Sequence, residues 1–199
     1  MKTKLVVATG NAHKLKEIAE IFPDFEVVSQ KQAGFDCEVE ETGKTFAENA
    51  LIKARAAANT LGCITLADDS GLCVDALGGA PGVCSARYSG EHGNDKANRT
   101  LLLKNLEGVC NRRAHFTCAL ALVLPNGEEI VVEGKTHGVI LTKEIGGGGF
   151  GYDCIFESDD LQKSFGVATS EEKNAVSHRA RALQALRKTW LGTEKENAE

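Results

Sequence analysis

Two pairs of adjacent acidic residues are the clearest candidates for chemistry in this sequence. Asp68-Asp69 directly follows the apolar run from Ile64 to Ala67, which is typical of a buried strand, and Glu40-Glu41 lies in an earlier polar segment. Adjacent carboxylates at the end of a buried strand repel each other unless a cation or a raised pKa offsets their charge. Their oxygens suit Mg²⁺, and an aspartate there could also deprotonate water. The pairs therefore indicate a magnesium site, with exposed acidic turns as the plainer alternative.

A second candidate is the segment Thr9-Gly10-Asn11-Ala12-His13-Lys14, which lies where a strand pattern turns into a helix pattern. A helix start offers backbone N–H groups and the positive end of the helix dipole, and Lys14 adds a cation. This combination suits a phosphate group, although Asn11 could equally be an ordinary N-cap beside a solvated lysine. The spacing of a Walker A loop is absent.

The segment Phe150-Gly151-Tyr152-Asp153 combines aromatic rings with a glycine that permits close approach of a flat group. We interpret it as a base-stacking element, with core aromatics as the alternative. The preceding glycines match G-x-G-x-x-G formally, but no helix pattern follows them directly, so a Rossmann dinucleotide site is not predicted.

Cationic and donor side chains gather at the start of the last helix pattern, where Ser177-His178-Arg179 follows Lys173. Arginine and a donor histidine can both donate to O6 of a purine. Adenine carries an amino group at that position, so a donor-only site would reject ATP. The alternative is a capped helix with exposed basic residues.

Several classes of protein are disfavoured. Seven cysteines without a C-x-x-C pair are expected to be reduced thiols, and the scattered histidines do not predict zinc. Ser70 is not in a nucleophile elbow, because Asp68 stands where G-x-S-x-G requires glycine. A net charge of −5 with scattered basic residues argues against a partner that is nucleic acid or a membrane surface. The N-terminal apolar run is too short for a signal peptide, so we expect a cytoplasmic protein.

The elements that must position these residues alternate between strand and helix patterns. We expect strands at 4–8, 25–29 and 63–67, a helix at 11–22, and a second helix that opens with the capping box Thr45-x-x-Glu48 and ends near Leu61. A helix at 95–106, strands at 115–124 and 129–141 joined by Pro125-Asn126-Gly127, and a last helix capped by Ser177 follow. This order predicts an α/β fold with parallel pairing at its centre. We expect one catalytic domain over 1–191 and a polar tail over 192–199.

Six ordered motifs resemble the inosine triphosphate pyrophosphatase family over most of the chain, from Thr9 to about Leu186. They are T-G-N-x-x-K, E-E-T-G-K-T-F-x-E-N-A, A-D-D-S-G-L, L-G-G-A-P-G-V-x-S-A-R-Y, G-F-G-Y-D and E-E-K-N-x-x-S-H-R. The resemblance implies an elongated mixed sheet with flanking helices, two lobes around a central active-site cleft, and a homodimer. Cys154, Val167 and Ala180 depart from residues that are common in the family.

The resemblance also implies roles for single residues. It assigns the segment from Thr9 to Lys14 to the triphosphate, Asp69 to Mg²⁺ and to activation of water, and Ser70 to substrate. Glu40 or Glu41, with Glu41 favoured, supplies a second metal carboxylate. The nucleotide is then held by Phe150, Gly151, Tyr152, Asp153, Lys173, His178 and Arg179.

These inferences predict a magnesium-dependent enzyme that converts ITP, dITP and XTP into the monophosphate and pyrophosphate. The purine nucleoside triphosphate is the expected partner, and Lys14 and Asp69 are the expected catalytic residues. A Maf-like pyrophosphatase that acts on other modified nucleotides is one alternative, and a nucleotide sensor without turnover is another.

Overall fold

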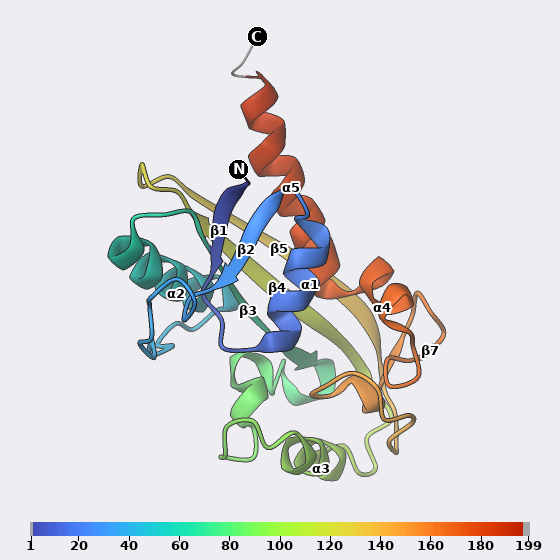
Figure 1. Cartoon of the computed structure of the whole chain (residues 1–199). Coiled ribbons are helices and arrows are strands. Elements are labelled where there is room, and N and C mark those ends of the chain that lie inside the picture. The colour runs from blue at the N-terminus through green and yellow to red at the C-terminus, as the bar shows by residue number, and fades with distance from the viewer. Residues whose placement is uncertain (1, 197–199) are drawn as a thin grey trace. The chain divides into compact units, whose positions relative to one another are not determined.

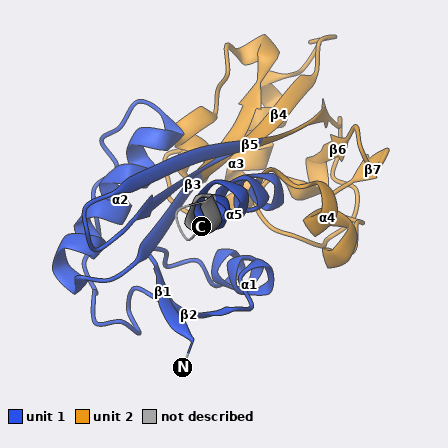
Figure 2. Ribbon diagram, turned by 90° about the horizontal axis from the view of Figure 1, so that it is seen from above, with its two compact units in different colours: residues 1–69, 118–134, 179–199 blue, residues 70–117, 135–178 orange. Residues whose placement is uncertain are grey.

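The computed structural model describes residues 2–196, in which strands and helices alternate along the first half of the chain (Figure 1). The chain divides into two compact units (Figure 2). Unit 1 contains residues 1–69, 118–134 and 179–199, and unit 2 contains residues 70–117 and 135–178. Three of the four boundaries fall inside strands, so no linker separates the units in the sequence.

Seven strands form one mixed sheet in the order β2-β1-β3-β4-β5-β6-β7. Their bounds are β1 (Thr3–Val7), β2 (Phe25–Ser29), β3 (Thr65–Val74), β4 (Arg113–Val123), β5 (Glu129–Ile140), β6 (Phe156–Ser158) and β7 (Lys163–Ser164). β1 pairs in parallel with both β2 and β3, whereas β5–β6 and β6–β7 are antiparallel. The α/β class is therefore confirmed, but these parallel pairs lie at one end of the sheet rather than at its centre.

Helices cover both faces of the sheet in unit 1 because successive strand side chains point to opposite faces. Leu5, Val7 and Leu66 pack with residues of α1 (Ala12–Ile21) and α5 (His178–Glu196). Ala8 and Ala67 pack instead with the alanines of α2 (Phe46–Leu61). Adjacent residues such as Leu66 and Ala67 of β3 thus pack on opposite faces, one against α1 and α5 and the other against α2.

The start of α2 is fixed by the predicted capping box. The Thr45 side chain accepts a hydrogen bond from the Glu48 backbone N–H, and the Glu48 side chain accepts one from the Thr45 backbone N–H. These bonds satisfy two donors that a helix start leaves open. Gly62 ends the helix with a left-handed φ of 62°. The small alanines of its buried face bring the backbone of α2 close to the sheet.

Unit 2 has its own apolar core. Leu72 and Val74 of β3 and Phe116 of β4 pack with Leu102 of α3 (Asp95–Asn105) and with Phe156 of β6. Three 3₁₀ segments, η1 (Asp75–Leu77), η2 (Gly82–Arg87) and η3 (Asp153–Ile155), and the short helix α4 (Ser170–Val176) complete this unit. No helix within the described range 2–196 is both long and apolar enough to cross a membrane.

Two expected boundaries were wrong. β3 continues to Val74, so Asp68 and Asp69 lie inside the strand and not at its end. The last helix continues to Glu196, so residues 192–196 are helical where a polar tail was expected, and 197–199 lie outside the described residues. Ser177 ends α4 and directly precedes α5. β3 extends beyond its local apolar pattern because Leu72 and Val74 pack in the core of unit 2.

Candidate active site

The strand alternation of β3 sends its two aspartates to opposite faces of the sheet. Asp68 follows the direction of Leu66 and meets Lys14 of α1 and Arg179 of α5. Asp69 follows the direction of Ala67 and meets Asn49 and Lys53 of α2. Adjacent buried carboxylates were expected to need a cation, and each aspartate has one nearby: Lys14 and Arg179 lie beside Asp68, and Lys53 lies beside Asp69.

Asp69 belongs to a group that we call the carboxylate–lysine group: Glu41, Asn49, Lys53 and Asp69. Asn49 Nδ2 donates to Asp69 Oδ2 at 3.1 Å, and Lys53 Nζ lies 3.9 Å from Asp69 Oδ1. The same ammonium group donates to Glu41 Oε1 at 2.6 Å and to the Asp68 carbonyl oxygen at 2.7 Å. One lysine therefore draws both carboxylates of the group together.

Gly43 explains how the loop that carries Glu41 approaches α2. Its backbone N–H donates to Asn49 Oδ1 at 2.8 Å, and a Cβ atom at this position would lie 2.6 Å from that same oxygen. A larger residue would push the loop away, so glycine is required by the close approach. Glu40 is exposed, whereas Glu41 is half-buried against Lys53. The geometry thus distinguishes Glu41 from its neighbour.

The charges of this group shift its pKa values in one direction. Burial raises the pKa of Asp69, the nearby Glu41 raises it further, and the attraction of Lys53 opposes this only in part. Burial lowers the pKa of Lys53, but the charges of Asp68, Asp69 and Glu41 outweigh burial and raise it overall. The lysine stays charged, and Asp69 is a stronger base than an ordinary surface aspartate.

The opposite face holds a chain of alternating charges. Lys14 Nζ lies 3.1 Å from Asp68 Oδ2, and Arg179 Nη2 lies 3.2 Å from the same oxygen. Arg179 also donates through Nη1 to Glu17 Oε2. Burial raises the pKa of Asp68, but the charges of Lys14, Arg179 and Lys53 outweigh burial and hold this pKa well below its usual range. Asp68 therefore holds both Lys14 and Arg179 in place, and Glu17 holds Arg179 from its other side.

Asn11 is the N-cap of α1, which was the alternative interpretation of the segment from Thr9 to Lys14. Its side-chain oxygen accepts hydrogen bonds from the backbone N–H groups of His13 and Lys14, at 2.9 and 3.3 Å. The Thr9 hydroxyl oxygen accepts from the Asn11 backbone N–H at 3.1 Å. These backbone donors are used within the turn, so the Lys14 ammonium group is the main candidate contact for a phosphate here. Gly10, Ala12 and His13 are exposed.

A second polar group lies in unit 2. Lys173 Nζ donates to Asp153 Oδ2 at 2.7 Å and lies 4.6 Å from the centre of the Phe150 ring. The same Asp153 oxygen accepts from the Phe150 backbone N–H at 2.9 Å. A Cβ atom on Gly149 would lie 2.1 Å from this oxygen, which explains the glycine. The group holds one aromatic ring beside a buried ion pair.

The remaining predicted base contacts have different environments. Tyr152 is a core residue whose hydroxyl donates to the Ser85 carbonyl oxygen at 2.8 Å. The Gly151 backbone N–H donates to Asp95 Oδ2 at 2.8 Å. His178 is buried and stacks on Phe116, with ring centroids 4.9 Å apart. The residues predicted to hold the nucleotide therefore belong to both units. Phe150, Asp153, Lys173 and His178 lie in unit 2, whereas Arg179 lies in unit 1 with Asp68.

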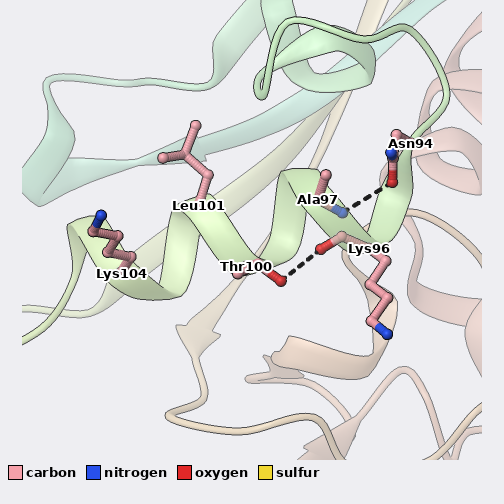
Figure 3. A pocket seen from close by; sticks show the side chains of 6 residues that line it. All are labelled: Asn94, Lys96, Ala97, Thr100, Leu101 and Lys104. Atoms are coloured by element: carbon pink, nitrogen blue, oxygen red, sulfur yellow. Dashed lines mark hydrogen bonds between the residues drawn. The ribbon is translucent and has the colours of Figure 1, made fainter.

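A hollow of about 470 Å³ lies over α3 and contains none of the predicted site residues (Figure 3). Asn94 uses its side-chain oxygen to cap the helix at Ala97, and the Thr100 hydroxyl donates to the Lys96 carbonyl oxygen. These polar atoms serve the helix itself. The hollow is not a candidate active site.

Sequence reasoning missed Asn49, Lys53 and Glu17. Asn49 and Lys53 stand four residues apart, next to the buried alanine stripe of α2, so both lie on the side of the helix that faces β3. The available signal in the sequence was an asparagine inside an alanine-rich helix pattern, and the structure shows that this asparagine is fully buried. Glu17 stands three residues after Lys14 on α1 and gave no comparable signal.

Residues 5–189 match the model of the Ham1 family. A dITP/XTP pyrophosphatase of Clostridium perfringens is 48% identical, with 95% of this chain and 98% of that protein covered. One of Geobacter sulfurreducens is 50% identical, with 96% and 100% covered. The structure of the Staphylococcus aureus Ham1 protein superposes with a TM-score of 0.88 at 41% identity, over 96% of this chain and 99% of that one. The resemblance that the motifs indicated is confirmed.

Proposed function

The chain belongs to the Ham1 family, and from this premise we propose that it hydrolyses dITP, XTP and ITP to the nucleoside monophosphate and pyrophosphate. Relatives named dITP/XTP pyrophosphatase align with almost its entire length. The single observation that carries the proposal is the carboxylate–lysine group, in which Asp69 is a buried base and the Lys53 ammonium group contacts both Asp69 and a second carboxylate, Glu41. This is a suitable arrangement for attack of water on the α-phosphorus and cleavage of the phosphoanhydride bond between the α- and β-phosphates.

The carboxylate–lysine group also fits a magnesium ion. Asp69 and Glu41 offer oxygen ligands on either side of one ammonium group, and burial together with the charge of Glu41 raises the pKa of Asp69. Within residues 2–196 no three acidic, histidine or cysteine side chains are placed to hold a metal together. Mg²⁺ typically takes one or two protein carboxylates and completes its shell with water and phosphate oxygens, so two suffice. Mg²⁺ held there would neutralise charge that develops on the phosphates.

The catalytic and phosphate-binding residues have separate roles in the proposed reaction. Asp69 accepts a proton from the water that attacks the α-phosphorus, and pyrophosphate leaves. Lys14 and Lys53 offset the charge of the phosphates, and Ser70 contributes a substrate contact. Asp68 acts by holding Lys14 in place, together with Arg179, whose guanidinium group is itself fixed by Glu17. Catalysis then rests on positioning and electrostatics.

Base recognition is assigned to unit 2 in this proposal. Phe150 offers a ring for stacking, and Lys173 and His178 are the donors for a carbonyl group at position 6 of the purine. A site made of donors penalises adenine, because its amino group would face them. Arg179 has a side chain that is only 2% exposed and is engaged by two carboxylates, so it supports selectivity less directly than expected.

The oligomer and the compartment follow from the same proposal. We expect a homodimer, in which the half-buried segment from Leu77 to Val83 is a candidate contact. Sedimentation velocity should show a mass near twice that of the chain, and a monomer at micromolar concentration would refute this. All seven cysteines are free thiols, which fits a cytoplasmic enzyme.

A substrate panel tests the proposed activity. Pyrophosphate release should be measured with dITP, XTP, ITP, GTP and ATP, with and without Mg²⁺, and the nucleotide product should be identified. We expect monophosphate and pyrophosphate, with kcat/KM for dITP and XTP exceeding that for ATP by about 10²-fold or more. Activity only on methylated or pyrimidine nucleotides would indicate the Maf-like alternative. Binding without turnover on every nucleotide would indicate a sensor.

A further inference from the structure

His115 of β4 and His137 of β5 lie directly opposite each other in the β4–β5 hairpin. The Leu124 backbone N–H donates to the Glu128 carbonyl oxygen at one end, and the Ile140 N–H donates to the Arg112 carbonyl oxygen at the other. The two strands contain the same number of residues between these two pairs. The pairing register is therefore the same at both ends of the hairpin. His115 and His137 are each three residues from the Arg112–Ile140 pair, which makes them cross-strand partners.

Their position in the ladder brings the two side chains close together. Hydrogen-bonded and non-hydrogen-bonded pairs alternate along an antiparallel ladder, so an odd separation from Arg112–Ile140 makes His115 and His137 a non-hydrogen-bonded pair. Side chains approach most closely in such pairs. The ring centroids are 5.5 Å apart. His137 is exposed and His115 is partly exposed, so both rings are accessible to an ion from solvent.

This spacing matches that of two imidazoles that share one metal ion. With metal–nitrogen bonds of about 2 Å, the ring centroids of two such ligands lie about 4.5–6 Å apart. We propose that His115 and His137 form a two-histidine binding site for a borderline divalent transition metal ion such as Ni²⁺ or Zn²⁺. Water would complete the coordination, since the pair supplies two ligands.

The charged groups around the pair are consistent with a neutral imidazole. Burial lowers the pKa of His115, the charges of Lys135 on β5 and of His137 lower it further, and the charge of Asp75 on η1 raises it. The nearby Arg113 donates two hydrogen bonds to the Asp159 carboxylate. Metal binding requires the deprotonated ring, so a lowered pKa favours binding near neutral pH.

Calorimetric titration of the full chain with Ni²⁺, in excess Mg²⁺ to occupy carboxylate sites, tests the proposal. We expect one Ni²⁺ per chain, and His115→Ala and His137→Ala should each weaken binding by at least about tenfold. His92→Ala is the matched control because His92 is an exposed histidine in a loop, and it should leave binding unchanged. Binding should weaken as the pH is lowered from 7.5 to 5, because protonation of His115 removes one metal ligand.

Thermal unfolding gives a second readout. Ni²⁺ should raise the melting temperature of the wild type and of His92→Ala, but not of His137→Ala, because an ion that binds only the native pair stabilises it. Circular dichroism confirms that the variants fold. Equal Ni²⁺ affinity in the wild type and in a folded His137→Ala variant would overturn the proposal, as would the absence of binding in the wild type.

Discussion

At the scale of single residues, the two aspartates of β3 contact different groups because their side chains point to opposite faces of the sheet. Asp69 shares the carboxylate–lysine group with a lysine that contacts three carboxylate or carbonyl oxygens. Asp68 instead stabilises two cations, Lys14 and Arg179. Adjacent residues in the sequence thus serve the proposed base and the proposed phosphate contacts separately.

Replacement of Lys53 by methionine should reduce kcat for dITP by about 10²–10³-fold, because one fixed positive charge beside the phosphates is lost. The pH profile should also change. Lys53 lowers the pKa of Asp69, so without Lys53 this pKa rises, and the acid limb of kcat/KM should move to higher pH. Steady-state kinetics from pH 5 to 9 measure both effects.

Lys16→Met is the control for this variant, because Lys16 is 75% exposed on α1. It should keep the kcat and the pH profile of the wild type. If Lys53→Met kept both as well, Lys53 would have no part in the reaction.

Part of this arrangement was predictable from residues alone. The period-2 alternation of a strand, applied to Leu66-Ala67-Asp68-Asp69, would have placed the aspartates on opposite faces. Their partners were not predictable, because Arg179 stands 111 residues from Asp68 and a local pattern carries no information on such pairs. The choice between Glu40 and Glu41 likewise required the contact with Lys53.

At the scale of elements, α2 positions Asn49 and Lys53, and its capping box decides where the helix begins. Thr45→Ala should lower the free energy of unfolding by about 1 kcal/mol, because the Glu48 backbone N–H loses its acceptor. Urea unfolding measures the change. Thr60→Ala, at an exposed site later in the same helix, is the control and should have an effect within about 0.5 kcal/mol. Equal effects of the two variants would contradict the capping role.

Long elements with strong local signals were predictable, and short ones were not. The capping box of α2 and the hairpin turn at Pro125-Asn126-Gly127 both form as expected. α4 opens with a similar box, Thr169-x-x-Glu172, but its seven residues are too few to show an apolar period. β6 and β7 have three and two residues, and only their pairing with distant strands makes them strands.

At the scale of the whole molecule, the buried Asp68 couples stability to pH. Its pKa in the folded protein is lower than in the unfolded chain, where an aspartate titrates near about 3.9. The ionised form therefore stabilises the fold fully above about pH 4, and this contribution is lost as the pH falls further. The free energy of unfolding should decrease steeply below pH 4.

The variant Asp68→Asn isolates this contribution. It should be less stable than the wild type at pH 7, because Lys14 and Arg179 lose their shared counter-charge, and the difference should shrink as the pH falls towards 3. Urea unfolding at several pH values measures this. Asp36→Asn, at a side chain that is 74% exposed, should show a small difference at every pH. A constant difference between Asp68→Asn and the wild type would contradict the coupling.

The division into two units was not visible as a composition change along the chain. Unit boundaries fall within β3, β4 and β5, and the sequence contains no linker at any of these three points. The family resemblance implied two lobes, but only the packing of distant segments defines which residues belong to each unit. Lys173 and His178 belong to one unit and Arg179 to the other, although they stand within seven residues of one another.

The most direct test of the account is the kcat/KM of Asp69→Asn with dITP and Mg²⁺, measured as pyrophosphate release. We predict a loss of about 10³-fold or more, because the amide can neither accept the proton of water nor hold the metal as a carboxylate does. Circular dichroism and the melting temperature should show a folded protein, and Glu40→Gln should stay active, because Glu40 is exposed and lies outside the carboxylate–lysine group. A folded Asp69→Asn enzyme with activity within about tenfold of the wild type would contradict the assignment of Asp69 as the base.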